Sequence, residues 1–245
     1  MFADLFDLVV PQRCSGCSAP GEILCPSCGA LLRGPAHAFL PVTAPSGLPA
    51  CYAAARYDGA VRAVIVAHKE RGRTGLSAPL GAALAGSAMA ACERDTAVRA
   101  GRTLLLVPVP SIRAAVRRRG HDPTLRMARR AAAGLARRGV AARCVAALRH
   151  GRTVRDQAGL SATDRVANLS GALAVSRARL VRGAPVVIVD DVITTGATVA
   201  EAARALRAAG ADVRSAAAVA APVAEGGPPA NGAAPECPVQ VPHGE

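Results

Sequence analysis

Two uninterrupted aliphatic runs, at residues 103–109 and 185–189, stand out from the rest of the chain. Neither run alternates apolar with polar positions, which is typical of strands in a parallel sheet covered on both faces. A weaker run at residues 212–219 follows Gly210. The pattern therefore predicts three strands, of which the first two are fully buried.

Helical patterns occupy the intervals between and before these runs. They cover approximately residues 59–70, 76–93, 123–138 and 197–209, and the last of them ends at Ala-Ala-Gly, a typical helix stop. Helix and strand patterns alternate along the chain. We therefore expect an α/β fold with a mostly parallel sheet.

Composition divides the 245 residues into three parts. Residues 1–50 hold a cysteine cluster and end in a proline-rich run at 35–49, which we interpret as a linker. Residues 51–222 carry the α/β pattern. Residues 223–245 are rich in Gly, Pro and Ala without periodicity, which predicts a disordered tail.

The composition is biased toward alanine among the apolar residues and toward arginine among the basic ones. With 57 Ala, two Tyr, three Phe and no Trp, the core must be small, aliphatic and closely packed. The net charge of +13 comes from 29 Arg and a single Lys, a usage that a GC-rich coding bias also produces. Residues 113–155 nevertheless contain 13 Arg and one acid, so this block alone carries +12.

The chain carries no sequence signal for a membrane or for export. No run reaches the roughly 18 consecutive apolar residues of a membrane span. The first residues include acids in place of a basic export signal, and no apolar segment with a cleavage site follows. We expect a cytoplasmic protein, in which eight Cys do not form a disulfide framework.

Four of the cysteines form two CxxC pairs separated by seven residues. They are Cys14, Cys17, Cys25 and Cys28. Two such turns supply four thiolates for tetrahedral coordination, and four sulfur ligands leave no open position for water. The spacing predicts a structural Zn²⁺ in a small N-terminal module; four cysteines without a metal are the alternative.

Residues 186–198 combine a strand, two acids, a loop rich in hydroxyl groups and a helix start. Asp190 and Asp191 end the aliphatic run, and Thr194, Thr195, Gly196, Ala197 and Thr198 follow. Unpaired N–H groups at a helix N-terminus favour a phosphate, and acids at the end of a parallel strand can accept bonds from sugar hydroxyls or face a divalent cation. A Walker loop is excluded because GxxxxGK[ST] is absent.

This segment resembles the 5-phosphoribosyl-1-pyrophosphate (PRPP) motif of type I phosphoribosyltransferases. The resemblance implies the fold of that family, with Asp190 and Asp191 as catalytic residues that contact the ribose hydroxyls. It also implies that residues 194–198 hold the 5′-phosphate. Such enzymes transfer a 5-phosphoribosyl group, with Mg²⁺, to a nitrogen nucleophile and release pyrophosphate.

Further segments are similar to the ComF family of competence-associated phosphoribosyltransferase-like proteins. They are Val107-Pro-Val-Pro110, Arg119-Gly120, Gln157-Ala-Gly-Leu-Ser161 with Arg165 and Asn168, Tyr57-Asp-Gly with His68-Lys69, and the double CxxC. The similarity covers approximately residues 8–222. Where the family has an aromatic residue followed by Asn-Gln, this chain has His121-Asp122-Pro123, so the acceptor substrate stays open.

Residues that follow the first aliphatic run, together with Lys69, are candidates for binding the pyrophosphate. We assign this role to Pro110, Ser111, Arg117, Arg118, Arg119 and Lys69. A surface salt bridge is the alternative for Lys69. The arginine block as a whole fits a groove for single-stranded DNA or a solvated helix face, and it has no aromatic residue for base stacking.

Three functions follow from these features. The first is a phosphoribosyltransferase acting on PRPP and an unknown acceptor. The second is a non-catalytic accessory protein of DNA uptake, which binds single-stranded DNA or a protein of the competence machinery. The third is a PRPP-sensing regulator. An intact phosphate loop predicts ligand binding in all three and does not decide turnover.

Overall fold

The computed structural model describes residues 12–41, 44–93, 96–151 and 171–222. The expected tail at 223–245 lies outside the described residues. So does the segment with Gln157, Ser161, Arg165 and Asn168.

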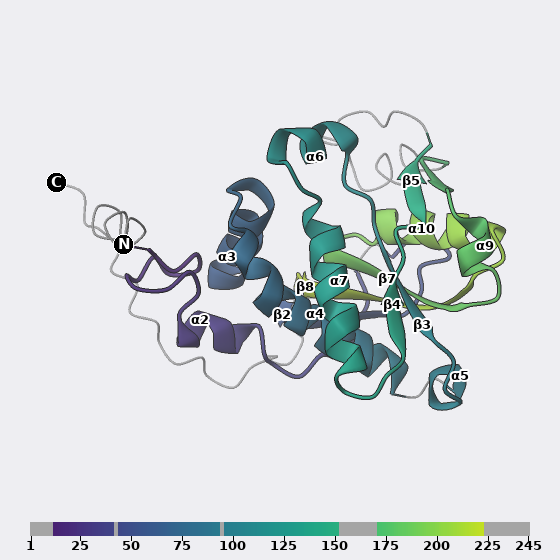
Figure 1. The fold of residues 1–245 in the computed structure, drawn as a ribbon, viewed down its shortest axis with the longest axis horizontal. Helices are drawn as coiled ribbons and strands as arrows, with labels where there is room; N and C mark the ends of the chain where they lie inside the picture. Colours follow the sequence, from purple (N-terminus) through teal and green to yellow (C-terminus); the bar gives the residue numbers. More distant parts are fainter. Residues whose placement is uncertain (1–11, 42–43, 94–95, 152–170, 223–245) are drawn as a thin grey trace, which may run out of the picture.

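A six-stranded sheet forms the middle of three layers (Figure 1). Its order is β1-β2-β8-β7-β3-β4, and all neighbours are parallel except β1 and β2. A separate antiparallel pair, β5 and β6, forms a small second sheet. The strands are β1 (His37–Phe39), β2 (Cys51–Arg56), β3 (Leu104–Pro108), β4 (Ala142–Cys144), β5 (Leu148–His150), β6 (Leu173–Val175), β7 (Pro185–Val192) and β8 (Asp212–Ala221).

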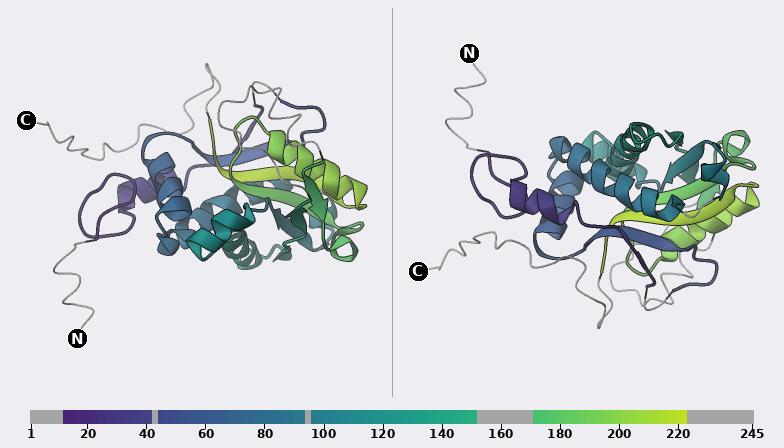
Figure 2. Two further views of the ribbon diagram at one scale, coloured as in Figure 1. Left: turned by 90° about the horizontal axis from the view of Figure 1, so that it is seen from above. Right: turned by 90° about the horizontal axis from the view of Figure 1, so that it is seen from below.

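Helices cover both faces of the sheet (Figure 2). One face packs against α3, α4 and α7, and the other packs against α10, α9 and the β5–β6 pair. The helices are α2 (Pro26–Leu31), α3 (Gly59–Glu70), α4 (Ser77–Cys92), α5 (Thr96–Arg99), α6 (Arg113–Arg119), α7 (Pro123–Ala136), α9 (Ala178–Val181) and α10 (Ala197–Ala208), with a short 3-10 helix, η1 (Thr74–Leu76). The expected α/β fold with a mostly parallel sheet is therefore confirmed.

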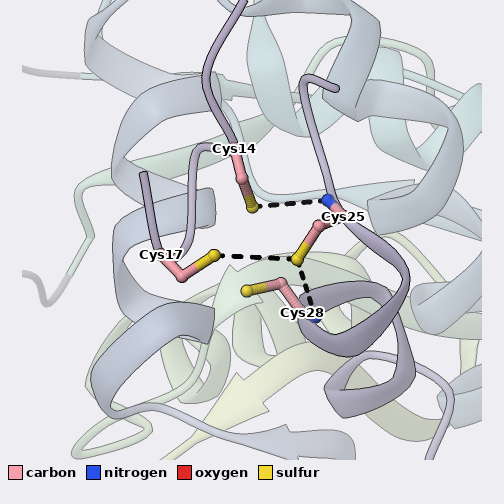
Figure 3. Close-up of side chains that lie close together, drawn as sticks. All are labelled: Cys14, Cys17, Cys25 and Cys28. Atoms are coloured by element: carbon pink, nitrogen blue, oxygen red, sulfur yellow. Dashed lines mark hydrogen bonds between the residues drawn. The ribbon is translucent and has the colours of Figure 1, made fainter. Parts of the chain in front are cut away.

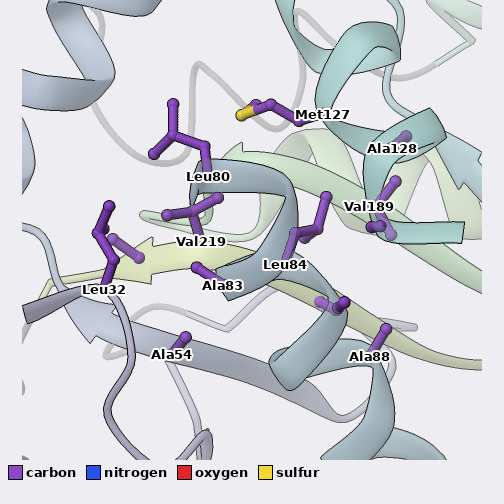
Figure 4. Packing of buried hydrophobic residues seen from close by; sticks show 14 of the residues in the cluster. Leu32, Ala54, Leu80, Ala83, Leu84, Ala88, Met127, Ala128, Val189 and Val219 are labelled. Carbon is purple, nitrogen blue, oxygen red and sulfur yellow. The ribbon is translucent and has the colours of Figure 1, made fainter. Parts of the chain in front are cut away.

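Small side chains bring the layers of this fold close together. An added Cβ on Gly81 of α4 would lie 2.4 Å from the Cβ of Arg130 on α7, so only glycine allows this helix crossing. Leu84 of α4 and Met127 of α7 are fully buried where these helices meet the sheet (Figure 4). In the same layer the hydroxyl of Ser87 donates to the carbonyl of Ala218 at 2.7 Å, which satisfies a buried polar group. The buried residues are mostly aliphatic and many of them are alanines, as the composition predicts.

One helical stretch among the described residues, Thr74–Cys92, has the length and hydropathy of a membrane span. Inside the fold, 56% of that window is buried, against α7 and the sheet. This burial is typical of the core helix of a folded domain.

The N-terminal residues contact the α/β layers directly. Strand β1 pairs with β2 through His37 and Ala53, and Leu32 is buried in the same core cluster as α3 and α4. Gly16 faces Ala60 of α3. The division of the chain at residues 50 and 222 stays a prediction.

The sheet has a topological switch point between β3 and β7. From β3, the chain crosses through α7 to β4 on one side, whereas from β7 it crosses through α10 over the opposite face to β8 on the other side. In open α/β sheets ligands bind outside the carboxyl ends of strands at such a point. The fold therefore predicts a binding site after Pro108 and after Val192.

Candidate functional site

Two adjacent acids end the central strand at this switch point. The carboxylate of Asp190 accepts the backbone N–H of Asp191 at 2.8 Å, and the carboxylate of Asp191 accepts the N–H of Val192 at 2.9 Å. Asp191 is buried and Asp190 is partly buried. These backbone bonds fix both side chains at the carboxyl end of β7.

Lys69 supplies the positive charge for this pair. Its ammonium lies 2.7 Å from Oδ2 of Asp191, although its own side chain is 39% exposed. Lys69 stands in the last turn of α3, so the pair joins this helix to β7. The surface salt bridge considered from the sequence is not what the structure shows, because the carboxylate partner is a buried strand residue.

Burial and charge separate the two acids electrostatically. Burial raises the pKa of Asp190 well above its ordinary value, and the charge of Asp191 adds to this effect. Burial would also raise the pKa of Asp191, but Lys69 more than offsets it and the net direction is downward. The ammonium of Lys69 compensates the carboxylate of Asp191, so ionisation of Asp190 as well would leave one negative charge uncompensated. Carboxylate oxygens are hard ligands, and a divalent cation such as Mg²⁺ fits this deficit.

The loop after β7 turns into α10 through a left-handed glycine. Gly196 has φ +76°, and an added Cβ would lie 2.9 Å from both methyl carbons of Leu48. No side chain caps the helix, and the hydroxyl of Thr195 lies 3.4 Å from the N–H of Ala197. The N–H of Ala197 donates to that hydroxyl, and the N–H groups that follow it in the first turn of α10 have no capping side chain and can face an anion beside the acids.

The end of β3 forms the opposite wall of the switch point. The carbonyl of Pro110 accepts a bond from Nε2 of His150 at 3.0 Å. The hydroxyl of Ser111 donates to Asp122 at 3.0 Å, and the same carboxylate oxygen caps α7 by accepting the N–H of Leu125. The helix start expected at Asp122-Pro123 is confirmed.

The arginines assigned to pyrophosphate occupy different positions on α6. Arg117 and Arg118 are exposed, whereas Arg119 is largely covered and its guanidinium binds Glu70 through both carboxylate oxygens. Glu70 follows Lys69 at the end of α3. The structure therefore brings Lys69, Asp190 and Asp191 together, and it anchors Arg119 beside them.

Sequence reasoning did not predict the ion pair of Glu70 with Arg119 or the contact between two histidines. The rings of His68 and His121 lie 5.9 Å apart, centroid to centroid, and the buried Nε2 atoms of both have no hydrogen-bond partner among the residues that the structure describes. Burial lowers the pKa of His68, with His121 and Arg126 acting in the same direction against the carbonyls of Arg73 and Pro123. The adjacency of His68, Lys69 and Glu70 was the available signal, since three polar residues directly follow the apolar run at 63–67 of this helix.

The four expected cysteines form a separate cluster near the N-terminus (Figure 3). Their sulfur atoms all lie within 4.8 Å of one another. Cys17 and Cys25 have sulfurs 3.7 Å apart. Tetrahedral Zn–S bonds of about 2.3 Å place sulfurs about 3.8 Å apart, so the residues fit Zn²⁺.

Backbone donors support the thiolates of this cluster. The N–H groups of Cys25 and Gly16 lie 3.3 and 3.4 Å from the sulfur of Cys14. Burial would raise the pKa of Cys14, but these donors lower it to about 6. Gly16 is required here, because an added Cβ would lie 2.7 Å from the sulfur of Cys28.

A comparison with protein families agrees with the observed fold. Residues 115–231 match the family described as phosphoribosyl transferase domain. The matched region contains α7, β7, the glycine turn and α10, and so includes Asp190, Asp191 and residues 194–198. A search of curated proteins found no match. The chain has a phosphoribosyltransferase-like α/β fold with a four-cysteine cluster near its N-terminus.

Proposed function

We propose that this protein binds PRPP with Mg²⁺ and transfers its 5-phosphoribosyl group to an acceptor nitrogen. The observation that carries the proposal is the junction of β7 and α10. There, paired acids precede a left-handed glycine turn and an uncapped helix N-terminus, inside the region that matches the phosphoribosyl transferase domain.

Each end of PRPP has candidate partners in this arrangement. Residues 194–198 would hold the 5′-phosphate, because a helix N-terminus favours an anion. Asp190 and Asp191 would accept bonds from the ribose hydroxyls. Lys69 and the segment from Pro110 through α6 would face the pyrophosphate, with Arg117 and Arg118 exposed to meet it and Arg119 anchoring the helix.

To catalyse this transfer, the protein must position the two substrates and neutralise the charges that develop during the reaction. The bond between ribose C1 and the pyrophosphate oxygen breaks as a C1–N bond forms, and the acceptor nitrogen loses a proton. Bound Mg²⁺ would neutralise charge on the leaving pyrophosphate. Asp190 and Asp191 would stabilise positive charge on the sugar, and Lys69 would hold Asp191 ionised.

The test has a binding arm and a turnover arm. Calorimetry with PRPP and Mg²⁺ should show saturable binding, and pyrophosphate release with a panel of amines and bases should identify the acceptor. Absence of binding by the intact protein would refute the proposal. Binding without release for any acceptor would favour a PRPP-sensing regulator or a non-catalytic accessory protein of DNA uptake.

Two further assignments belong to the same proposal. The four cysteines hold a structural Zn²⁺, supported by their spacing and sulfur distances. The chain is a cytoplasmic ComF-like protein, supported by the double CxxC, the VPVP strand end and the phosphate loop in their order. Zinc analysis of the purified protein checks the first assignment, and loss of transformation in a deletion strain checks the second.

A further inference from the structure

A groove of about 560 Å³ runs along the exposed side of α7. Arg126, Arg129 and Arg130 line it, and His121 lies at the start of the helix. Small-molecule sites commonly have volumes of about 300–1,000 Å³, so this groove can accept a molecule the size of a mononucleotide.

Within the part of the chain that the structure describes, the arginines of this groove have no acidic partner. Among the salt bridges of the described residues, none involves Arg126, Arg129 or Arg130. Their spacing of three and four positions puts like charges on adjacent helical turns, an arrangement that is unfavourable without an anion. Asp122 is the acid lining the groove, and its carboxylate is engaged by Ser111 and the N–H of Leu125.

His121, at the start of the groove, has a ring nitrogen without a hydrogen-bond partner among the described residues. Its Nδ1 lies 3.2 Å from the carbonyl of Arg119, so the proton of the neutral ring resides on Nδ1 and Nε2 carries a lone pair. That Nε2 is buried without a partner among the described residues.

We propose that this groove binds the phosphate group of a small phosphorylated molecule of about mononucleotide size. Guanidinium groups bind phosphate oxygens in pairs of parallel hydrogen bonds, and three of them face this volume. None of the described residues lining the groove is Phe, Tyr or Trp, which disfavours the stacked bases of single-stranded DNA. The groove begins one hydrogen bond from Ser111, at the edge of the switch point.

Separate residues make this proposal independent of the one for PRPP. The groove arginines stand on α7, whereas the proposed PRPP residues lie on α3, β7, α10 and the segment from Pro110 through α6. A failure of one site therefore leaves the other intact.

Arginine footprinting tests the groove directly. Phenylglyoxal modifies accessible guanidinium groups, and mass spectrometry locates each adduct. Saturating AMP should slow the modification of Arg129 and Arg130 severalfold and leave Arg137 and Arg138, just beyond the same helix, unprotected. Equal rates with and without AMP at Arg129 and Arg130 would overturn the proposal.

Two double variants, compared at one salt concentration, provide a second test of AMP binding in the groove. R129A/R130A should lose AMP protection of Arg126 and weaken the groove's AMP affinity about tenfold or more, whereas R137A/R138A should behave as the wild type. Both variants should keep PRPP affinity, and both should fold, because Arg130→Ala retains the Cβ that faces Gly81. An equal loss in both variants, or tighter groove protection by oligothymidylate than by AMP, would refute a small-molecule site.

Discussion

The ammonium of Lys69 lies 2.7 Å from the carboxylate of Asp191, at the point where α3 meets the end of β7. Lys69 is the single lysine of the chain, and its partner is buried. A buried carboxylate that loses its cation is left uncompensated, whereas neutralising both groups removes the penalty. The pair therefore connects the stability of the fold with the charge state of the site.

Lys69→Met should destabilise the protein by about 1–2 kcal/mol, less than for a fully buried pair because the lysine is partly exposed. Adding Asp191→Asn should recover part of this loss. Urea unfolding of the two single variants and the double variant measures the coupling. Additive effects would show that the contact contributes nothing.

Gly196→Ala should cost more stability than Gly139→Ala. Both glycines have positive φ, +76° and +81°, but only Gly196 has a neighbour within 4 Å of its added Cβ, namely Leu48. Backbone strain of about 1–2 kcal/mol applies to both, and the Leu48 contact adds to it at Gly196. Thermal unfolding compares the two variants. Adding Leu48→Ala to Gly196→Ala should remove the steric contact and so reduce the difference between them. Equal losses of stability in Gly196→Ala and Gly139→Ala would contradict the prediction.

Cys17→Ser should lose zinc and lower the unfolding temperature, because three thiolates bind the ion more weakly than four. Cys144→Ser is the matched control, since Cys144 lies on β4 outside the cluster. Elemental analysis and thermal unfolding with and without a chelator measure both effects. Full zinc content in Cys17→Ser would refute the four-thiolate site.

Glu201 should make stability depend on pH below about 4.5. Its buried carboxylate accepts the N–H of Leu173 at 3.0 Å and two bonds from Arg204. Burial would raise the pKa of Glu201, but Arg204 and the backbone donors lower it below the ordinary 4.5. A lowered folded-state pKa gives stability that is present above 4.5 and is lost as the pH falls through the folded value.

Glu201→Gln checks this carboxylate. The amide oxygen can still accept from Leu173, so the variant should lose less than about 1–2 kcal/mol at pH 7. Between pH 5 and 3 the unfolding free energy of the variant should fall less steeply than that of the wild type. Denaturant unfolding over that range measures it, and identical pH profiles for the variant and the wild type would contradict the assignment.

The strongest patterns of the sequence predicted the centre of the fold. Strands β3, β7 and β8 and helices α3, α4, α7 and α10 lie where aliphatic runs and helical periodicity indicated. Strand β2 was missed because Cys-Tyr-Ala-Ala-Ala-Arg has little intrinsic strand preference. It forms because parallel pairing with β8 buries it, which is a tertiary effect.

For the candidate site, the sequence indicated that the two acids and the loop lie at one strand end, but not which side chains from other elements contact them. Asp190, Asp191 and residues 194–198 follow one strand, so their proximity is local. The contacts of Lys69 with Asp191 and of Glu70 with Arg119 join positions far apart in the chain, and no spacing rule indicates them. The contact of His68 with His121 has the same origin.

Calorimetric titration with PRPP and Mg²⁺ tests the central claim most directly. The wild type should bind PRPP saturably, with affinity that falls when Mg²⁺ is withheld. Asp190→Asn/Asp191→Asn should weaken binding at least about tenfold, whereas Asp212→Asn, an acid at the start of β8 paired with Arg214, should bind as the wild type does. Equal PRPP affinity in the wild type and the double variant, or no binding by the wild type, would contradict the account.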